Sequence, residues 1–145
     1  AIIWDFLVSL IHSLSKRLIP RKAISFAFVG ITGVLVQLLI SYSFMWFLGF
    51  TFQNVLPIAV VAAATSNYLV NNWLTFRVNR LKNKALFVGL IKFLLVSSLP
   101  IIANVGLASS FYKLVSPNTL FSQLAGIIVV FIWNYAASSK LVWKI

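Results

Sequence analysis

The feature that most constrains this chain is a series of long apolar runs separated by short basic segments. There are four such runs, residues 24–48, 55–76, 85–112 and 120–139. The third contains one charged side chain, and the other three contain none. At about 1.5 Å of rise per residue, each run is long enough as a helix to cross a hydrocarbon core about 30 Å thick. The sequence therefore predicts an all-α integral membrane protein with four transmembrane helices.

Composition argues against a soluble domain. Of 145 residues, 61% are hydrophobic and only 9% are charged, whereas soluble domains carry about 25% charged residues. A chain this short has too little interior to bury so much apolar surface. It contains no cysteine, which excludes disulfides and thiolate metal sites.

The charge pattern predicts an orientation in the membrane. Twelve Lys and Arg face a single acid, and they gather before residue 24 and in the loop at residues 77–84. Because cations accumulate on the cytoplasmic side, both termini and this loop are expected there, in the cell (inner, cytoplasmic) membrane. Clusters between apolar runs do not form the continuous basic face that nucleic acid requires, so no nucleic-acid partner is expected.

Residues 1–20 predict an amphipathic juxtamembrane helix. Apolar side chains recur at helical spacing from Ile3 to Ile19, with Lys16 and Arg17 on other faces, and Pro20 follows. The segment is too short and too polar to span, but it suits a helix lying in the membrane interface. The alternative is a linker helix packed against a soluble domain.

An internal repeat organises the rest of the chain, residues 21–145. A shift of 67 residues aligns a first half, about residues 21–80, with a second, about residues 85–145. Each half holds two predicted spans, so the halves are expected to be parallel hairpins related by an axis along the membrane normal. The aligned pairs include Phe26 with Phe93, Asn67 with Asn134, Tyr68 with Tyr135 and Phe76 with Trp143.

The repeat places amide side chains inside the predicted spans. Amides at mid-depth are costly unless they find partners, and they usually face the bundle interior or a wet cavity. Two interpretations stay open: hydrogen bonds that hold the helices together, or a polar path for a lipid headgroup. The residues concerned are Gln37, Asn67, Asn71, Asn72, Asn104 and Asn134.

The basic segments are the candidate binding site for an anionic lipid. Arginine offers two parallel hydrogen bonds to a phosphate and lysine a point charge. The alternative is that these cations only set the topology. The candidate phosphate-binding residues are Arg21, Lys22, Arg77, Arg80, Lys82 and Lys84.

Residues for catalysis are scarce. Asp5 and His12 are the only acidic residue and the only histidine, so paired carboxylates, a metal cluster and a catalytic triad are not expected. No catalytic residue, metal or cofactor is therefore expected in this chain. A proton-coupled multidrug exporter, another small four-helix class, needs a carboxylate within the membrane, and the predicted spans contain none.

Three segments resemble the GtrA-like membrane protein family. Residues 26–33, with Phe26, Val29, Gly30 and Gly33, resemble its opening motif. Residues 67–77, N-Y-L-V-N-N-W-L-T-F-R, resemble its second-helix signature, and residues 134–144 resemble its fourth helix. The second repeat departs from the opening motif, with Ser97 and Pro100 at the positions of the two glycines.

This resemblance implies work on polyprenyl-phosphate-linked sugars in cell-surface polysaccharide biosynthesis. Such proteins move these lipids across the membrane, or serve as the membrane subunit or anchor of a family-2 glycosyltransferase similar to dolichol-phosphate mannose synthase. The implied partners are the sugar lipid, the membrane and a glycosyltransferase domain or subunit, and a homo-oligomer is left open. The chain is expected to be the C-terminal membrane half of such a fusion, or a related stand-alone protein.

Overall fold

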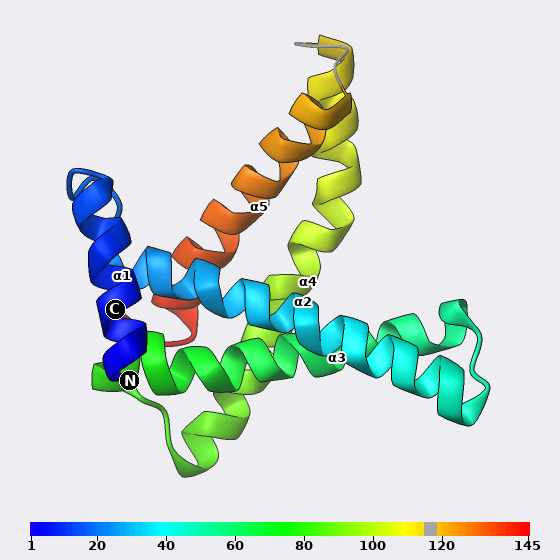
Figure 1. Cartoon of the computed structure of the whole chain (residues 1–145), viewed down its shortest axis with the longest axis horizontal. Helices are drawn as coiled ribbons and strands as arrows, with labels where there is room; N and C mark the ends of the chain where they lie inside the picture. Colours follow the sequence, from blue (N-terminus) through cyan, green and yellow to red (C-terminus); the bar gives the residue numbers. More distant parts are fainter. Residues whose placement is uncertain (115–118) are drawn as a thin grey trace. The chain divides into compact units, whose positions relative to one another are not determined.

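The computed structural model describes the backbone of residues 1–114 and 119–145, and the side chains of residues 1–99 and 127–145. Throughout this described part the regular elements are helices, which confirms the all-α prediction (Figure 1). The side chain of Asn104, one of the predicted intramembrane amides, lies outside the described residues. The elements are α1 (Ile2–Leu14), α2 (Arg21–Leu48), α3 (Phe52–Val70), η1 (Asn71–Thr75), η2 (Arg77–Asn79), α4 (Asn83–Leu114) and α5 (Thr119–Leu141).

The chain divides into two compact units, residues 1–82 and residues 83–145. The first unit contains α1, the α2–α3 hairpin and the short helices η1 and η2. The second unit contains the α4–α5 hairpin. The division falls within the basic loop that separates the two sequence repeats.

In the first unit, α2 and α3 run side by side as an antiparallel pair (Figure 1). Pro20 precedes the first turn of α2, and Gly49 ends the helix in the left-handed conformation, at a φ of 69°. Glycine reaches this conformation without the steric cost that a Cβ brings. Thr51 then caps α3, its Oγ1 accepting a hydrogen bond from the backbone N–H of Asn54 at 3.4 Å. The sequence thus turns the chain sharply within three residues.

The two helices approach closely where Asn67 of α3 lies on Gly33 of α2. A Cβ built on Gly33 would be only 2.6 Å from Asn67 Cγ, and closer still to the amide oxygen. Small residues at helix crossings allow this kind of backbone approach. By contrast, a Cβ on Gly30 would meet nothing within 4 Å.

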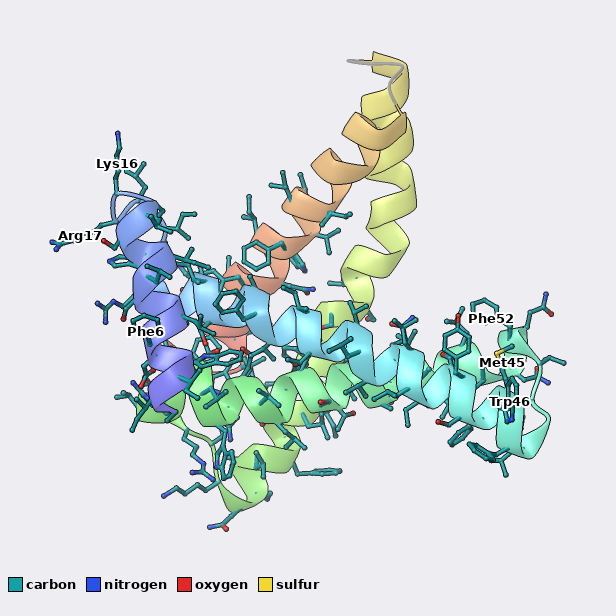
Figure 2. All side chains as sticks on the ribbon, in the orientation of Figure 1. Phe6, Lys16, Arg17, Met45, Trp46 and Phe52 are labelled. Carbon is teal, nitrogen blue, oxygen red and sulfur yellow. The ribbon has the colours of Figure 1, made fainter. Side chains whose placement is uncertain are left out.

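Helix α1 is shorter than the apolar spacing of residues 3–19 predicts. It ends at Leu14, because Lys16 and Arg17 both adopt positive φ, at 51° and 63°. Their N–H groups bond back to the carbonyls of Ser13 and His12, at 3.0 and 2.9 Å, which closes a Schellman-type cap. Figure 2 shows both side chains at this end of α1, which then returns to α2 through Pro20.

Apolar surface faces outward along α2. This helix is the one, within the described part of the chain, that is long and apolar enough to cross a membrane, with a mean hydropathy of 2.3. Within the most apolar 18-residue stretch of α2, only 33% is buried. Large side chains such as Trp46 are exposed near the hairpin turn (Figure 2). A soluble core helix would bury most of this surface. The other three predicted spans stay predictions.

In the second unit, one aromatic contact matches a contact in the first. The rings of Phe93 and Trp143 meet edge to face at 5.9 Å, and those of Phe26 and Phe76 meet in the same way at 6.4 Å. These are residues that the 67-residue shift aligns. Each hairpin therefore has an aromatic pair joining the N-terminal part of its first helix to the residues just after its second.

The backbone repeats as well at this point. The N–H of Phe76 bonds to the carbonyl of Asn71 at 2.8 Å, and the N–H of Trp143 to that of Ser138 at 3.2 Å. Both bonds span five residues, which is the spacing of a π-helix turn. In the first unit this turn forms η1.

Candidate functional site

A cavity of about 330 Å³ lies in the first unit, lined by α1, by the start of α2, on which α1 packs, by the end of η1 and by η2. We call it the basic pocket. Its lining combines charged side chains with the indole of Trp4 and the apolar side chain of Val8. The charged lining residues are Asp5, Arg21, Lys22 and Arg77.

The structure divides the six predicted phosphate-binding cations. Arg21, Lys22 and Arg77 line the basic pocket. Arg80 instead lies over the ring of Trp73, 5.4 Å from its centroid, which is a cation–π arrangement. Lys82 is exposed in the first unit, and Lys84 is exposed at the start of α4 in the second.

Two of the pocket cations come from the first turn of α2, directly after the chain returns from α1. Lys22 Nζ lies 5.9 Å from the ring centroid of Phe76. That ring is fully buried and packs on Phe26. The aromatic pair of this hairpin therefore lies beside Lys22, which also lines the basic pocket.

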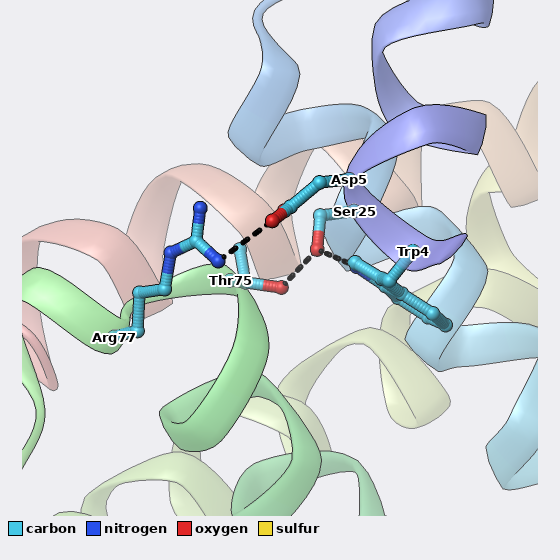
Figure 3. A network of polar contacts seen from close by, with 5 residues as sticks. All are labelled: Trp4, Asp5, Ser25, Thr75 and Arg77. Atoms are coloured by element: carbon cyan, nitrogen blue, oxygen red, sulfur yellow. Dashed lines mark hydrogen bonds and ion pairs between the residues drawn. The ribbon is translucent and has the colours of Figure 1, made fainter. Parts of the chain in front are cut away.

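The third cation is paired with the only acidic side chain of the chain. Arg77 Nη1 lies 3.0 Å from Asp5 Oδ2, and the two side chains are 52% and 47% exposed (Figure 3). An ion pair with this exposure is screened by water and contributes little to stability, at most about 1 kcal/mol. With Asp5 counted, the pocket still carries an excess of positive charge.

A chain of hydrogen bonds forms the pocket wall beside this ion pair (Figure 3). Trp4 Nε1 donates to Ser25 Oγ at 2.9 Å, and Thr75 Oγ1 donates to Asn71 Oδ1 at 2.8 Å. Thr75 has one hydroxyl proton, so in the 2.7 Å contact between the two hydroxyls Ser25 is the donor. Both hydroxyl protons are therefore used within the wall, and its role is to attach α1 to α2 and η1.

The loop that carries Arg77 is held by Asn72. The side chain of Asn72 donates through Nδ2 to the carbonyl of Leu81 at 3.1 Å, and its Oδ1 accepts from the N–H of Leu81 at 2.8 Å. Asn72 is buried and Leu81 is half-buried, so this two-point contact is partly shielded from water. It closes a loop of residues 73–80 around η2.

The predicted amides thus have different environments. Asn71 and Asn72 are nearly fully buried and form the hydrogen bonds just described. Asn67 Oδ1 is also buried but has no hydrogen-bond partner among the described residues. Asn134 Oδ1, in the second unit, is in the same condition. Gln37 is partly exposed, one helical turn beyond Gly33 on the same face of α2.

Charge patterning does not reveal the lining residues Trp4, Ser25 and Thr75, nor Asp5 as the partner of Arg77. One sequence pattern does indicate Trp4 and Asp5. The leucines of α1 form one helical stripe, whereas Trp4, Asp5 and Val8 share the opposite face. That face turns toward the rest of the unit, and the leucine stripe is exposed.

The chain combines hairpins that expose apolar side chains with a basic pocket that suits an anion. These features define a class, the helical membrane proteins that bind an anionic group near the membrane surface. The family model described as GtrA/DPMS, transmembrane domain, matches residues 25–143, and the chain therefore belongs to the GtrA/DPMS transmembrane-domain family. This membership confirms the resemblance drawn from the motifs, and it indicates a membrane role in the processing of polyprenyl-phosphate sugars. No curated protein is similar enough to the chain to match it.

The family match begins within the pocket wall. Ser25, Thr75 and Arg77 lie inside the matched region, whereas α1, Arg21 and Lys22 precede it. The basic pocket is therefore built partly from the family domain and partly from the segment before it.

Proposed function

We propose that the protein binds polyprenyl-phosphate-linked sugars and holds their phosphate in the basic pocket. The convergence of Arg21, Lys22 and Arg77 on one cavity carries this proposal. A phosphate monoester or diester brings one or two negative charges, which these side chains meet with charge-assisted hydrogen bonds. The cavity is at the lower end of the size range of small-molecule pockets, which suits a headgroup rather than a whole lipid.

The proposal includes the four-span topology that the sequence predicts. With both termini and the loop at residues 77–82 in the cytoplasm, the basic pocket opens at the cytoplasmic surface. The polyprenyl tail then lies in the bilayer against the exposed apolar face of α2, which includes Val34, Leu35 and Leu38. Phosphate and tail are thus separated as they are in the lipid itself.

We infer further that the protein moves the sugar headgroup across the membrane. The buried oxygens of Asn67 and Asn134, which lack partners among the described residues, support this step. Leaving an acceptor unpaired in an apolar interior costs about 1–3 kcal/mol, so such atoms mark places where a ligand hydroxyl or water would bind favourably. Sugar hydroxyls supply donors of this kind.

A second candidate function is the membrane subunit or anchor of a glycosyltransferase. One observation favours it: α1 precedes the matched domain and packs directly onto the basic pocket. A catalytic domain or subunit attached there would receive its lipid acceptor at the pocket. Catalysis would then belong to that domain or subunit.

Lipid binding tests the proposal directly. Arg77→Gln should weaken the binding of a polyprenyl phosphate to protein in phosphatidylcholine nanodiscs by roughly tenfold or more, because a hydrogen bond to a charged group contributes about 1.5–3 kcal/mol. Arg80→Gln is the matched control, since Arg80 lies over Trp73 instead. If both variants and the unmodified protein bind the lipid with equal affinity, the basic pocket does not bind its phosphate.

Transport assays separate the two candidate functions. In liposomes that contain a labelled sugar lipid, Asn67→Leu with Asn134→Leu should stop transfer between leaflets while phosphate binding is retained. Full transfer by this double variant would make both amides structural. Binding without any transfer by the unmodified protein would support the anchor function.

A further inference from the structure

We propose that Asp5 is a built-in counter-anion, which α1 holds on Arg77 until the phosphate of the lipid takes its place. This inference rests on the proposed function of the basic pocket. It assigns a role to the N-terminal helix, which lies outside the matched family domain. Lipid binding would thereby loosen α1 from the pocket.

The position of the acidic residue supports this role. The chain has twelve cationic side chains and one carboxylate, and that carboxylate lies in the basic pocket, 3.0 Å from Arg77. Both partners are about half exposed. Water and ions therefore reach the pair, and exposed pairs of this kind are weak enough to be exchanged.

The competing anion has the advantage in the number of contacts. The phosphodiester of a sugar-linked lipid carries one negative charge, as a carboxylate does, whereas the monoester of a sugar-free polyprenyl phosphate carries up to two and offers three acceptor oxygens. Arg21 and Lys22 line the same cavity and would contact the phosphate together with Arg77. Displacement of Asp5 thus exchanges one contact for several.

Helix α1 has two separate attachments at this point. One is the Asp5–Arg77 pair. The other is Trp4, which donates to Ser25 and packs edge to face on Phe28 at a ring distance of 5.7 Å. When the phosphate replaces Asp5, the Trp4 attachment is retained, so α1 becomes more mobile without leaving. Val8, the buried residue on the pocket-facing side of α1, reports such a change.

Equilibrium binding tests the competition. Asp5→Asn should bind a short-chain polyprenyl phosphate in phosphatidylcholine nanodiscs roughly three- to tenfold more tightly than the unmodified protein, because a competing and repelling charge is removed. Ser13→Lys is the matched control, since it raises the net charge equally at an exposed position of α1. An equal gain from Ser13→Lys, or no gain from Asp5→Asn, would overturn the proposal.

A double-mutant cycle shows whether Asp5 acts through Arg77. In the Arg77→Gln background, Asp5→Asn should change the affinity by less than about twofold, because the competed side chain is absent. A full gain in that background would assign the effect to general repulsion and contradict the exchange. The same affinity measurements, repeated with the prenyl alcohol, inorganic phosphate and phosphatidylglycerol as ligands, identify which source of phosphate competes with Asp5.

Thiol labelling tests the movement of α1 without measuring affinity. The chain has no cysteine, so Val8→Cys is a single reporter, and Ser13→Cys is its exposed control. Asp5→Asn should raise the labelling rate at residue 8 roughly two- to fivefold before lipid is added. Adding polyprenyl phosphate should raise the labelling rate equally in the protein with Asp5. In the Asp5→Asn variant it should cause no further rise. A rate that responds to neither change would refute the proposed role of α1.

The two proposals fail in different ways. If neither the unmodified protein nor any variant binds polyprenyl phosphate better than the prenyl alcohol, the proposed function fails and the counter-anion role fails with it. If the lipid binds and depends on Arg77, but Asp5→Asn changes neither affinity nor labelling, only the counter-anion role fails.

Discussion

At the scale of single residues, Gly33 shows how closely the first hairpin is packed. The amide of Asn67 occupies the space that a Cβ at position 33 would need. The short asparagine side chain cannot avoid a methyl group there without moving its buried oxygen or separating the helices. The contact thus couples the choice of residue 33 to that of residue 67.

Gly33→Ala should therefore destabilise the protein by about 1–3 kcal/mol, the usual cost of forcing an extra group into a packed site. Gly30→Ala is the matched control, because its Cβ would meet no atom within 4 Å and alanine favours a helix. Unfolding by a denaturing detergent measures both changes. Adding Asn67→Ala to Gly33→Ala should recover most of the loss, and no recovery would contradict the predicted collision.

Trp4 makes a second residue-scale prediction. Trp4→Phe keeps a ring against Phe28 but removes the N–H that bonds to Ser25. Loss of this part-buried hydrogen bond should cost about 1 kcal/mol in the attachment of α1. Labelling of Val8→Cys should then be roughly fivefold faster, and Trp4→Phe should leave the rate at Ser13→Cys unchanged. An unchanged rate at residue 8 would show that the indole N–H does not hold α1.

The sequence predicts residue types better than it predicts partners. Charge clustering identified Arg21, Lys22 and Arg77 as candidates, but it included Arg80 on equal terms. The difference arises from contacts between residues far apart in the chain, such as Asp5 with Arg77 and Ser25 with Thr75. A pattern of charges along the chain contains no information about such pairs.

At the scale of elements, the π-helix turn η1 departs from the sequence prediction of one continuous helix over residues 55–76. Regular helix ends at Val70, and η1 follows over Asn71–Thr75. Apolar periodicity does not distinguish a bond to the fourth residue from one to the fifth. The turn nevertheless matters for the site, since Thr75 within it lines the basic pocket and Asn71 accepts the hydrogen bond of Thr75.

The contact between Asn72 and Leu81 gives a prediction for the loop that follows η1. Asn72→Ala removes both hydrogen bonds to the Leu81 backbone, at a cost of about 1–2 kcal/mol. Amide exchange at Leu81 should then be roughly tenfold faster. Asn79→Ala, an exposed position in the same loop, is the control. Equal exchange in the two variants would mean that Asn72 does not order the loop.

Element boundaries were predicted to within a few residues for α2 and α5, because Pro20, Gly49 and the charge clusters mark them. For α1, the apolar spacing predicts an end that is too late in the chain. Its apolar spacing continues past Leu14, but Lys16 and Arg17 take positive φ values that neither side chain favours by itself. Local backbone bonding decided that end.

At the scale of the whole molecule, topology is the prediction with the widest consequences. The central loop is expected in the cytoplasm and the α2–α3 turn outside. Single cysteines at exposed Val78 and Phe50 test this in intact cells, since the chain has no other thiol. A membrane-impermeant reagent should label Phe50→Cys and spare Val78→Cys until the membrane is opened. The opposite pattern would place the basic pocket on the wrong side for a cytoplasmic lipid.

The internal repeat was visible in the sequence as a few aligned residues, and the structure adds their geometry. Phe26 with Phe76 and Phe93 with Trp143 form the same edge-to-face pair, one in each unit. The sequence could align these positions, but it could not show that the members of each pair touch. Contact between the ends of a hairpin depends on how its helices pack.

Because each aromatic pair lies inside its own unit, each hairpin contains the contact that closes it. During synthesis, residues 1–82 emerge before the second hairpin exists. With the topology that the sequence predicts, the first hairpin can therefore enter the bilayer and complete its aromatic contact while the ribosome is still translating the remainder. An arrangement of this kind favours insertion two helices at a time over assembly from a fully released chain.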